Sequence, residues 1–185
     1  MLRQKFKDQS GFTLMEILIV VILMGILAMV VIPQISVSSE DTKAATLQSN
    51  LTQIRNLLEV YYAQHAEKYP GEINHATGSG APADDAAAAV SFVAQLAQYT
   101  DSTGKASTSD RTNFTLGPYI KSISLPPNPF NSKSSVIIDS TVTDITARTV
   151  NDPADINDGY KFFVKTGVLI ACDGGTSNGV DHNNY

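Results

Sequence analysis

Gly11-Phe12-Thr13-Leu14-Met15-Glu16 opens an apolar run that ends at Ile35, and this stretch decides the fold of the 185-residue chain. A carboxylate near the start of such a run is unusual, because an acidic side chain at the centre of a membrane helix costs about 2.5–3.5 kcal/mol. A simple membrane anchor gains nothing from Glu16. We therefore infer that Glu16 acquires a partner that neutralises it in another state of the protein.

The residues that flank the apolar run predict its orientation and distinguish it from a secretory signal. Residues 1–11 hold three basic side chains against one acid, which favours a cytoplasmic N-terminus. Residues 12–32 are 21 almost wholly apolar positions, enough for one bilayer crossing of about 20 residues. A secretory signal has its small-residue cleavage site after the apolar core, whereas here the small pair Ser10-Gly11 precedes it.

These features together resemble the N-terminal signal of type IV pilins and of the related pseudopilins of type II secretion. The match comprises the basic leader, the Gly11-Phe12 junction, Glu16 at the fifth position after the junction, and the apolar run. The resemblance implies that a prepilin peptidase removes residues 1–11 by cutting between Gly11 and Phe12. The same enzyme would then methylate the amino group of Phe12.

The resemblance also implies a partner for Glu16. Proteins of this kind pack their N-terminal helices, here residues 12–35, side by side in a helical filament. The carboxylate of Glu16 would then lie near the ammonium group of Phe12 in a neighbouring subunit. Desolvation limits the net stabilisation from such a pair, but an unpaired carboxylate in an apolar bundle is strongly unfavourable. We therefore expect the pair to set the register of assembly. An ordinary single-pass anchor is the alternative, and it explains neither the junction nor the position of Glu16.

The apolar run is expected to continue as one long helix whose second half, residues 40–69, is amphipathic. Apolar and aromatic residues recur there at spacings of three and four, which places them on one helix face. This face contains Leu47, Leu51, Ile54, Leu58, Tyr61 and His65. A helix from residue 12 to residue 67 would be about 84 Å long, so lipid or other subunits must bury its first half. Tyr69-Pro70-Gly71 is expected to end it.

Two residues weaken the first half of this helix. Pro33 lacks an N–H group and clashes with the preceding turn, so a kink is expected there. Gly25, eight residues earlier, has a poor helix propensity. We predict that the segment between Gly25 and Pro33 loosens in a filament and makes it extensible.

Residues 36–185, which include the amphipathic helix half, predict a small globular head. Asp84-Asp85 can cap a second helix over residues 86–98. The apolar side expected for that helix is Val90, Val93, Leu96 and Ala97.

The β-strands are expected in the second part of the head. Single strands are predicted at residues 136–139 and 142–147, and a hairpin is predicted from residues 160–164 and 168–171 around Gly167. A small antiparallel sheet would then cover the buried face of the long helix. The result is an α+β, pilin-like fold.

Composition and motifs argue against an enzyme and against nucleic-acid binding. Without residues 1–11 the chain carries 10 Lys and Arg against 17 Asp and Glu, so no phosphate-binding surface is expected. The chain has three histidines and no H-x-x-x-H, C-x-x-C, H-E-x-x-H or G-x-S-x-G motif. Its single cysteine, Cys172, excludes an intramolecular disulfide and is expected to be buried at the end of a strand.

The tail from Asp173 to Asp181 is rich in glycine and in side-chain oxygens, which suits the flexible oxygen-lined loops that Ca²⁺ prefers. Major pseudopilins carry a C-terminal calcium loop, and this tail resembles it in composition and position. The resemblance implies calcium as a cofactor, with Asp173, Asn178 and Asp181 as ligands. The alternative is a polar chain end without a ligand.

The resemblance as a whole implies a structural subunit, held in the bacterial inner membrane with its head in the periplasm and then extracted into a filament. Its partners would be other copies of the chain, prepilin peptidase, the inner-membrane assembly platform and minor pilins or pseudopilins. The lack of a disulfide loop and the Tyr69-Pro70 pair favour a major pseudopilin of type II secretion. The alternatives are a surface type IV pilin for adhesion, motility or DNA uptake and, more remotely, a membrane-anchored binding protein.

Overall fold

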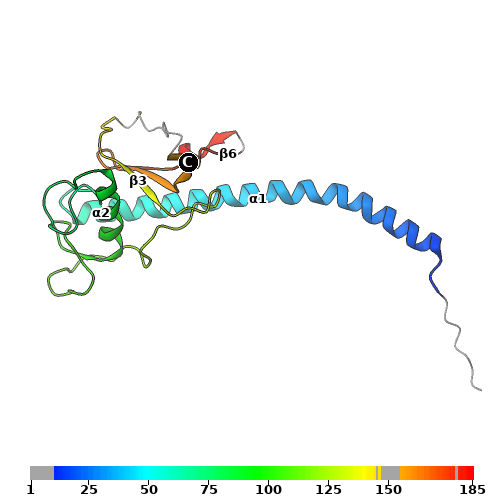
Figure 1. The fold of residues 1–185 in the computed structure, drawn as a ribbon, viewed down its shortest axis with the longest axis horizontal. Coiled ribbons are helices and arrows are strands. Elements are labelled where there is room, and N and C mark those ends of the chain that lie inside the picture. The colour runs from blue at the N-terminus through cyan, green and yellow to red at the C-terminus, as the bar shows by residue number, and fades with distance from the viewer. Residues whose placement is uncertain (1–10, 145, 147–154, 178) are drawn as a thin grey trace, which may run out of the picture. The chain divides into compact units, whose positions relative to one another are not determined.

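The computed structural model describes residues 11–144, 146, 155–177 and 179–185, apart from the side chains of residues 30–38 and 155. Contacts within the chain divide it into two units, residues 1–40 and residues 41–185. One long helix, α1 (Leu14–Gln64), runs through both units (Figure 1). The head is built on the second half of α1 and holds every strand that the structure describes. Residues 1–10 of the predicted leader lie outside the described residues.

The helix α1 ends earlier than the sequence predicts. Its last residue is Gln64, whereas the predicted stop is Tyr69-Pro70-Gly71. Ala66 and Glu67 adopt left-handed backbone conformations with φ of 52° and 59°, and the Glu67 N–H donates to the carbonyl of Tyr62 at 3.2 Å. Left-handed residues after the last turn commonly end a helix, because they reverse the chain and satisfy its terminal carbonyls.

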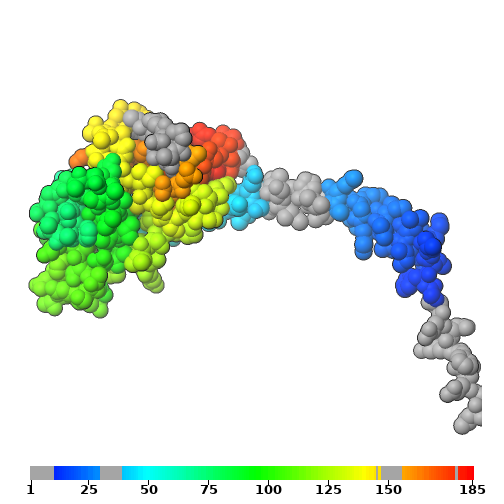
Figure 2. All heavy atoms as spheres, viewed as in Figure 1, coloured from blue at the N-terminus to red at the C-terminus, as the bar shows by residue number. Residues whose placement is uncertain are grey.

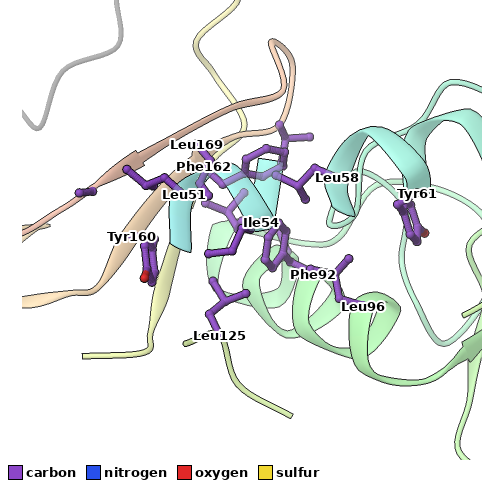
Figure 3. Packing of buried hydrophobic residues seen from close by; sticks show 14 of the residues in the cluster. Leu51, Ile54, Leu58, Tyr61, Phe92, Leu96, Leu125, Tyr160, Phe162 and Leu169 are labelled. Carbon is purple, nitrogen blue, oxygen red and sulfur yellow. The ribbon is translucent and has the colours of Figure 1, made fainter. Parts of the chain in front are cut away.

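The second half of α1 buries the face that the spacing predicts. All six residues of that face are buried, and none is more than 2% exposed. Figure 3 shows Ile54 and Leu58 of α1 in one cluster with Phe92 and Phe162, which come from the second helix and the sheet. Burial of one leucine side chain contributes about 1.5–3 kcal/mol. This face therefore holds the head together.

His65 lies at the end of the buried face, just after α1, and is hydrogen-bonded through both ring nitrogens. Its Nδ1 donates to the carbonyl of Tyr61 at 2.8 Å, and its Nε2 accepts from the hydroxyl of Thr100 at 2.9 Å. The ring stacks on that of Tyr61 with centroids 3.7 Å apart. Burial lowers the pKa of His65, against smaller opposing effects of the Tyr61 carbonyl and of Asp101.

The helix α2 (Asp85–Ala97) begins where the sequence predicts but turns a different face inward. The Asp84 Oδ1 accepts the N–H of Ala87 at 2.7 Å and so caps the helix. Val90, predicted for the apolar side, is 60% exposed, and only Leu96 of that predicted set is buried. The predicted face is therefore wrong. The residues that α2 buries are Ala88, Ser91, Phe92, Ala94, Gln95 and Leu96.

Gln95 explains why α2 is rotated relative to the prediction. Its Nε2 donates to the carbonyls of Ile73 at 3.0 Å and Gly104 at 2.7 Å, and its Oε1 accepts the N–H of Gly71 at 2.7 Å. A buried amide with all these partners carries little desolvation penalty. Gln95 therefore lies inside, and Phe92, one turn before it, enters the core.

The main sheet has three strands in the order β3 (Val136–Asp139), β4 (Tyr160–Phe163) and β5 (Val168–Ala171). The strands β4 and β5 form the predicted antiparallel hairpin, with Gly167 in its turn at φ 71°. However, β3 pairs with β4 in parallel, so the prediction of an antiparallel sheet is wrong for this pair. Residues 140–159 separate the two strands, which is long enough for the crossover that parallel pairing requires.

The remaining elements are short. Two antiparallel ladders join β1 (Tyr99–Thr100) to β2 (Ala106–Ser107) and β6 (Thr176–Ser177) to β7 (Val180–Asp181). Two 3₁₀ turns, η2 (Asp155–Asn157) and η3 (His182–Asn184), complete the described elements. Of the predicted strand 142–147, residues 142–144 and 146 lie in no strand, and residues 145 and 147 lie outside the described part. Cys172 is buried directly after β5, as predicted.

Candidate processing and assembly site

The predicted cleavage junction, Gly11-Phe12, lies immediately before α1 in irregular backbone. Phe12 is 82% exposed, and no atom lies within 4 Å of the position that a Cβ would take on Gly11. Peptidases act on accessible, irregular segments of this kind rather than on intact helices. The junction is thus sterically open within the described residues.

Thr13 and Glu16 together form a capping box at the start of α1. The Thr13 Oγ1 accepts the N–H of Glu16 at 3.2 Å, and the Glu16 Oε2 accepts the N–H of Thr13 at 3.1 Å. The Thr13 hydroxyl also donates to the Glu16 Oε2 at 3.2 Å. Two backbone donors that a helix start leaves without partners are satisfied in this way. The role of Thr13 escaped the sequence reasoning, although the Thr-x-x-Glu spacing signals such a box.

The capping box gives Glu16 hydrogen bonds but no counter-charge. Both groups of Thr13 are neutral, and the helix start supplies only a partial positive charge of about one half. A full positive charge nearby would stabilise the carboxylate further, most of all in apolar surroundings. That Glu16 acquires such a partner in a filament stays a prediction.

The first half of α1 exposes its large apolar side chains. Between Phe12 and Met29 each of these side chains is between 46% and 87% exposed, and together they form the blue surface of Figure 2. The exposed set includes the eight consecutive residues from Ile17 to Met24, which cover the whole circumference of a helix. A contiguous apolar surface of this extent marks a site of contact with protein or membrane.

Gly25 and Pro33 are the two residues predicted to weaken this half, and the structure describes only Gly25 in full. Gly25 lies inside α1 with open space where a side chain would be, so packing within the chain does not require a glycine there. Pro33 lies among residues 30–38, outside the described side chains, and the predicted kink stays a prediction.

Within the described part of the chain, no helix is both long enough and apolar enough to cross a membrane. The predicted span, residues 12–35, extends into residues 30–38, and it stays a prediction.

Of the three predicted calcium ligands, the structure describes Asp173 and Asp181. The Asp173 carboxylate accepts from His182 Nδ1 at 2.6 Å, from the Gly175 N–H at 2.8 Å and from Asn128 Nδ2 at 2.7 Å. Asp181 is exposed and precedes η3. Asn178 lies outside the described residues. Calcium binding by these residues stays a prediction.

Another polar group of the tail escaped the sequence reasoning. The Asn183 Oδ1 is buried and has no hydrogen-bond partner. Asn183, Asp181 and Gly174 line a hollow of about 190 Å³. Among the described residues, no three His, Cys, Asp or Glu side chains are grouped so that they could hold a metal ion. No sequence pattern at Asn183 signals this arrangement.

Comparison with protein families and with curated proteins identifies similar sequences. The model of the prokaryotic N-terminal methylation motif matches residues 6–32. The type II secretion system core protein G of Pseudomonas aeruginosa is 38% identical over 55 residues, which are 30% of this chain and 39% of that protein. The protein of the same name from Aeromonas hydrophila is 34% identical over 64 residues, 35% of this chain and 44% of that protein.

The protein of the same name from Vibrio cholerae is 33% identical over 58 residues, 31% of this chain and 40% of that protein. The chain thus spans about two fifths of the length of the curated relatives it matches. Comparison with solved structures finds none that matches. The matches confirm the resemblance to type IV pilin-like pseudopilins that the residues around Gly11-Phe12 predict.

Proposed function

We propose that this chain is a structural subunit of a pilin-like filament, of the major-pseudopilin kind that serves type II protein secretion. One observation carries the proposal: a methylation motif over residues 6–32 leads into a helix whose large apolar side chains, from Phe12 to Met29, are exposed. Such a surface is unfavourable in water and must be covered by lipid or by other copies of the chain. The relatives named as core protein G of type II secretion support the same assignment.

Processing prepares the subunit in this proposal. A prepilin peptidase cuts the open Gly11-Phe12 bond and methylates the amino group of Phe12. Residues 12–35 span the inner membrane with the N-terminus in the cytoplasm, in accordance with the basic leader, and the head lies in the periplasm. The capping box fixes the start of α1 at Leu14, so the new amino group on Phe12 lies two residues before the first residue of the helix.

Assembly exchanges the environment of Glu16. In the single subunit its carboxylate accepts hydrogen bonds from Thr13. In the filament the ammonium group of Phe12 from a neighbouring copy supplies the missing counter-charge, and the apolar surfaces of both helices cover each other. The assembly platform of the inner membrane and minor pseudopilins are the further partners. The Gly25–Pro33 segment loosens to make the filament extensible.

A surface type IV pilin is the second candidate. It is favoured by the stretch between β2 and β3, residues 108–135, which contains no helix or strand and offers irregular chain for surface contacts. Immunogold electron microscopy of the host at native expression separates the two candidates. Label confined to the cell envelope supports the secretion pseudopilin, and label along surface filaments supports the pilin.

Mass spectrometry of the chain isolated from its host tests the processing. An N-methylated Phe12 as the first residue is the expected result. A chain that keeps Met1, or one cut after Ser36, would contradict the filament proposal and favour an ordinary anchor or secreted protein.

Substitutions at the capping box test the assembly step. Glu16→Gln keeps a side-chain acceptor for Thr13 but removes the charge, whereas Thr13→Val keeps the charge and removes the hydroxyl. Loss of one member of a buried ion pair costs about 3–5 kcal/mol, so we expect Glu16→Gln to reduce the yield of sheared filaments at least tenfold and Thr13→Val to reduce it less. Glu40→Gln, exposed on the same helix, is the matched control. Equal yields for Glu16→Gln and this control would refute the pairing.

A further inference from the structure

Three side chains of the C-terminal segment form a continuous hydrogen-bond chain inside the head. The Ser177 hydroxyl lies 2.8 Å from His182 Nε2, and His182 Nδ1 lies 2.6 Å from the Asp173 Oδ1. Because a carboxylate oxygen accepts, Nδ1 donates to Asp173, and Nε2 is then the acceptor for Ser177 in the neutral ring. We call this set of three residues, Ser177, His182 and Asp173, the tail latch.

The tail latch is enclosed by aromatic rings and shielded from water. Ser177 is 4% exposed and His182 is 2% exposed. The imidazole ring lies against Phe130 with centroids 3.9 Å apart, and the ring of Tyr185 lies 5.6 Å away on a nearly parallel plane. In such surroundings hydrogen bonds are stronger than in water, and an unpaired polar group would be costly.

The tail latch also connects the tail to two distant parts of the head. The Asp173 Oδ2 accepts from Asn128 Nδ2 at 2.7 Å. Asn128 lies in the Pro-rich segment 126–129 before β3, which we call the connector. Tyr185, which packs beside His182, accepts through its carbonyl from Arg55 Nη1 of α1 at 2.7 Å and donates through its hydroxyl to the Ser177 carbonyl at 3.3 Å. The tail is therefore fixed to both the connector and the long helix.

The order serine, histidine and aspartate is that of a hydrolytic triad, but enclosure rules out that use in this state. A nucleophilic serine must present its oxygen to a substrate beside groups that stabilise the oxyanion. The Ser177 side chain lies inside the head, and the rings of Phe130 and Tyr185 pack against the buried imidazole. The geometry serves to hold the chain.

The same contacts disfavour calcium at Asp173. Ca²⁺ takes six to eight oxygen ligands, and a coordinating carboxylate must turn its oxygens towards the ion. The two Asp173 oxygens together accept hydrogen bonds from three donors: Oδ1 from His182 and Gly175, and Oδ2 from Asn128. The Asp173 side chain is 3% exposed. The donor groups on His182, Asn128 and Gly175 point where an ion would have to lie, and each would lose its partner.

We propose that the tail latch fixes the C-terminal segment on the head without a metal ion, in the role that a calcium loop or a disulfide would otherwise perform. The proposal concerns the head alone, so it stands or falls independently of filament assembly. Its prediction is that the stability of the tail depends on His182 and does not depend on calcium.

Hydrogen exchange followed by mass spectrometry tests this on the full chain in detergent micelles. Backbone amides of residues 173–185 are compared with and without EDTA, and with added Ca²⁺. We expect equal protection in all three conditions. Loss of a buried hydrogen-bonded partner typically exposes a segment about tenfold or more, so we expect His182→Ala to accelerate exchange of the tail by that factor. His75→Ala, which removes a half-buried histidine bonded to Ser91 at 3.0 Å, is the matched control.

Two conservative variants keep the test decisive if His182→Ala does not fold. His182→Asn can still donate to Asp173, and Ser177→Ala leaves the Asp173 contact intact. Both should accelerate exchange of the tail relative to the wild type and leave β4 and β5 protected. A tenfold gain of protection on adding Ca²⁺ to the wild-type chain would overturn the proposal. So would exchange in both conservative variants equal to that of the wild type, or covalent labelling of Ser177 by a fluorophosphonate.

Discussion

The two halves of α1 both carry large apolar side chains but use them in opposite ways. From Phe12 to Met29 the large apolar residues occupy all sides of the helix and are at least 46% exposed. From Leu47 to Tyr61 five of them lie on one face and are at most 2% exposed, whereas Val60, on another side of the helix, is 47% exposed. An apolar face on one side of a helix packs against other elements of the same chain, whereas an apolar surface on all sides of a helix is buried by lipid or by other molecules. The angular distribution of apolar residues therefore indicates where the partner of a helix lies.

The largest expected effect separates the two halves by one matched pair of substitutions. Leu51→Ala removes a fully buried side chain, and such a change lowers the free energy of unfolding by about 2–5 kcal/mol. Ile22→Ala removes a side chain that is 53% exposed and should change the stability of the head by less than about 0.5 kcal/mol. Urea unfolding of the full chain in detergent micelles measures both. Equal losses of unfolding free energy in the two variants would contradict the difference in packing between the two halves of α1.

A pH-dependent effect is expected at the end of the buried half. Burial lowers the pKa of His65, and Tyr61, Thr100, Tyr119 and Asp101 surround the ring or act on it. The unfolded chain has a histidine pKa of about 6.5, so the contribution of His65 to stability is complete above that pH and is lost as the pH falls below it. The melting temperature should therefore fall between about pH 7.5 and about pH 5.5.

The variant His65→Gln isolates this contribution. It should flatten the dependence of the melting temperature on pH, whatever its effect on stability at neutral pH. His75→Gln, at the half-buried histidine bonded to Ser91, is the matched control. If the melting temperature of His65→Gln depended on pH as steeply as that of the wild type, protonation of His65 would not contribute to the pH dependence of stability.

A smaller effect is expected at the helix that covers the buried half. Asp84→Ala removes the side-chain acceptor of the Ala87 N–H at the start of α2, which should lower the free energy of unfolding by about 1 kcal/mol. Asp84→Asn keeps an acceptor and should restore most of the loss. Thermal unfolding of the full chain measures both, and a loss that Asn does not restore would assign the effect to charge instead.

The smallest effect is expected in the exposed half. Gly25→Ala adds a methyl group in open space and should favour the helix by about 0.5–1 kcal/mol, with no change in unfolding of the head. Circular dichroism in micelles measures the added helicity. If the Gly25–Pro33 segment gives the filament its extensibility, filaments of this variant should also stretch less under force. Equal extension would remove that role from Gly25.

Sequence reasoning succeeded where a short-range pattern carries the information. The spacing of three and four predicts six buried residues, five in α1 and His65 just after it, and the Gly11-Phe12 motif predicts the methylation signal that the family comparison finds. The capping box could have been predicted as well, since Thr13 and Glu16 have the required separation. These features depend on residues within one or two turns of each other.

The features that were missed depend on partners distant in the sequence. Gln95 is buried because Gly71, Ile73 and Gly104 lie beside it, and hydropathy alone would place a glutamine outside. The parallel pairing of β3 with β4 depends on the path of the intervening chain. The tail latch joins residues with no periodic spacing, so only the folded tail reveals that they meet.

The contact between Arg55 and Tyr185 joins residues 130 positions apart. Contacts across so long a loop form slowly, because the entropy of closing the loop is lost before the contact exists. During synthesis the buried stripe of α1 emerges well before the strands that cover it. The nascent chain thus carries two adhesive surfaces at once, and only one of them disappears when the head closes. A cell that makes this protein must keep the buried stripe from aggregating until the head closes, and must keep the exposed half of α1 from aggregating beyond that point.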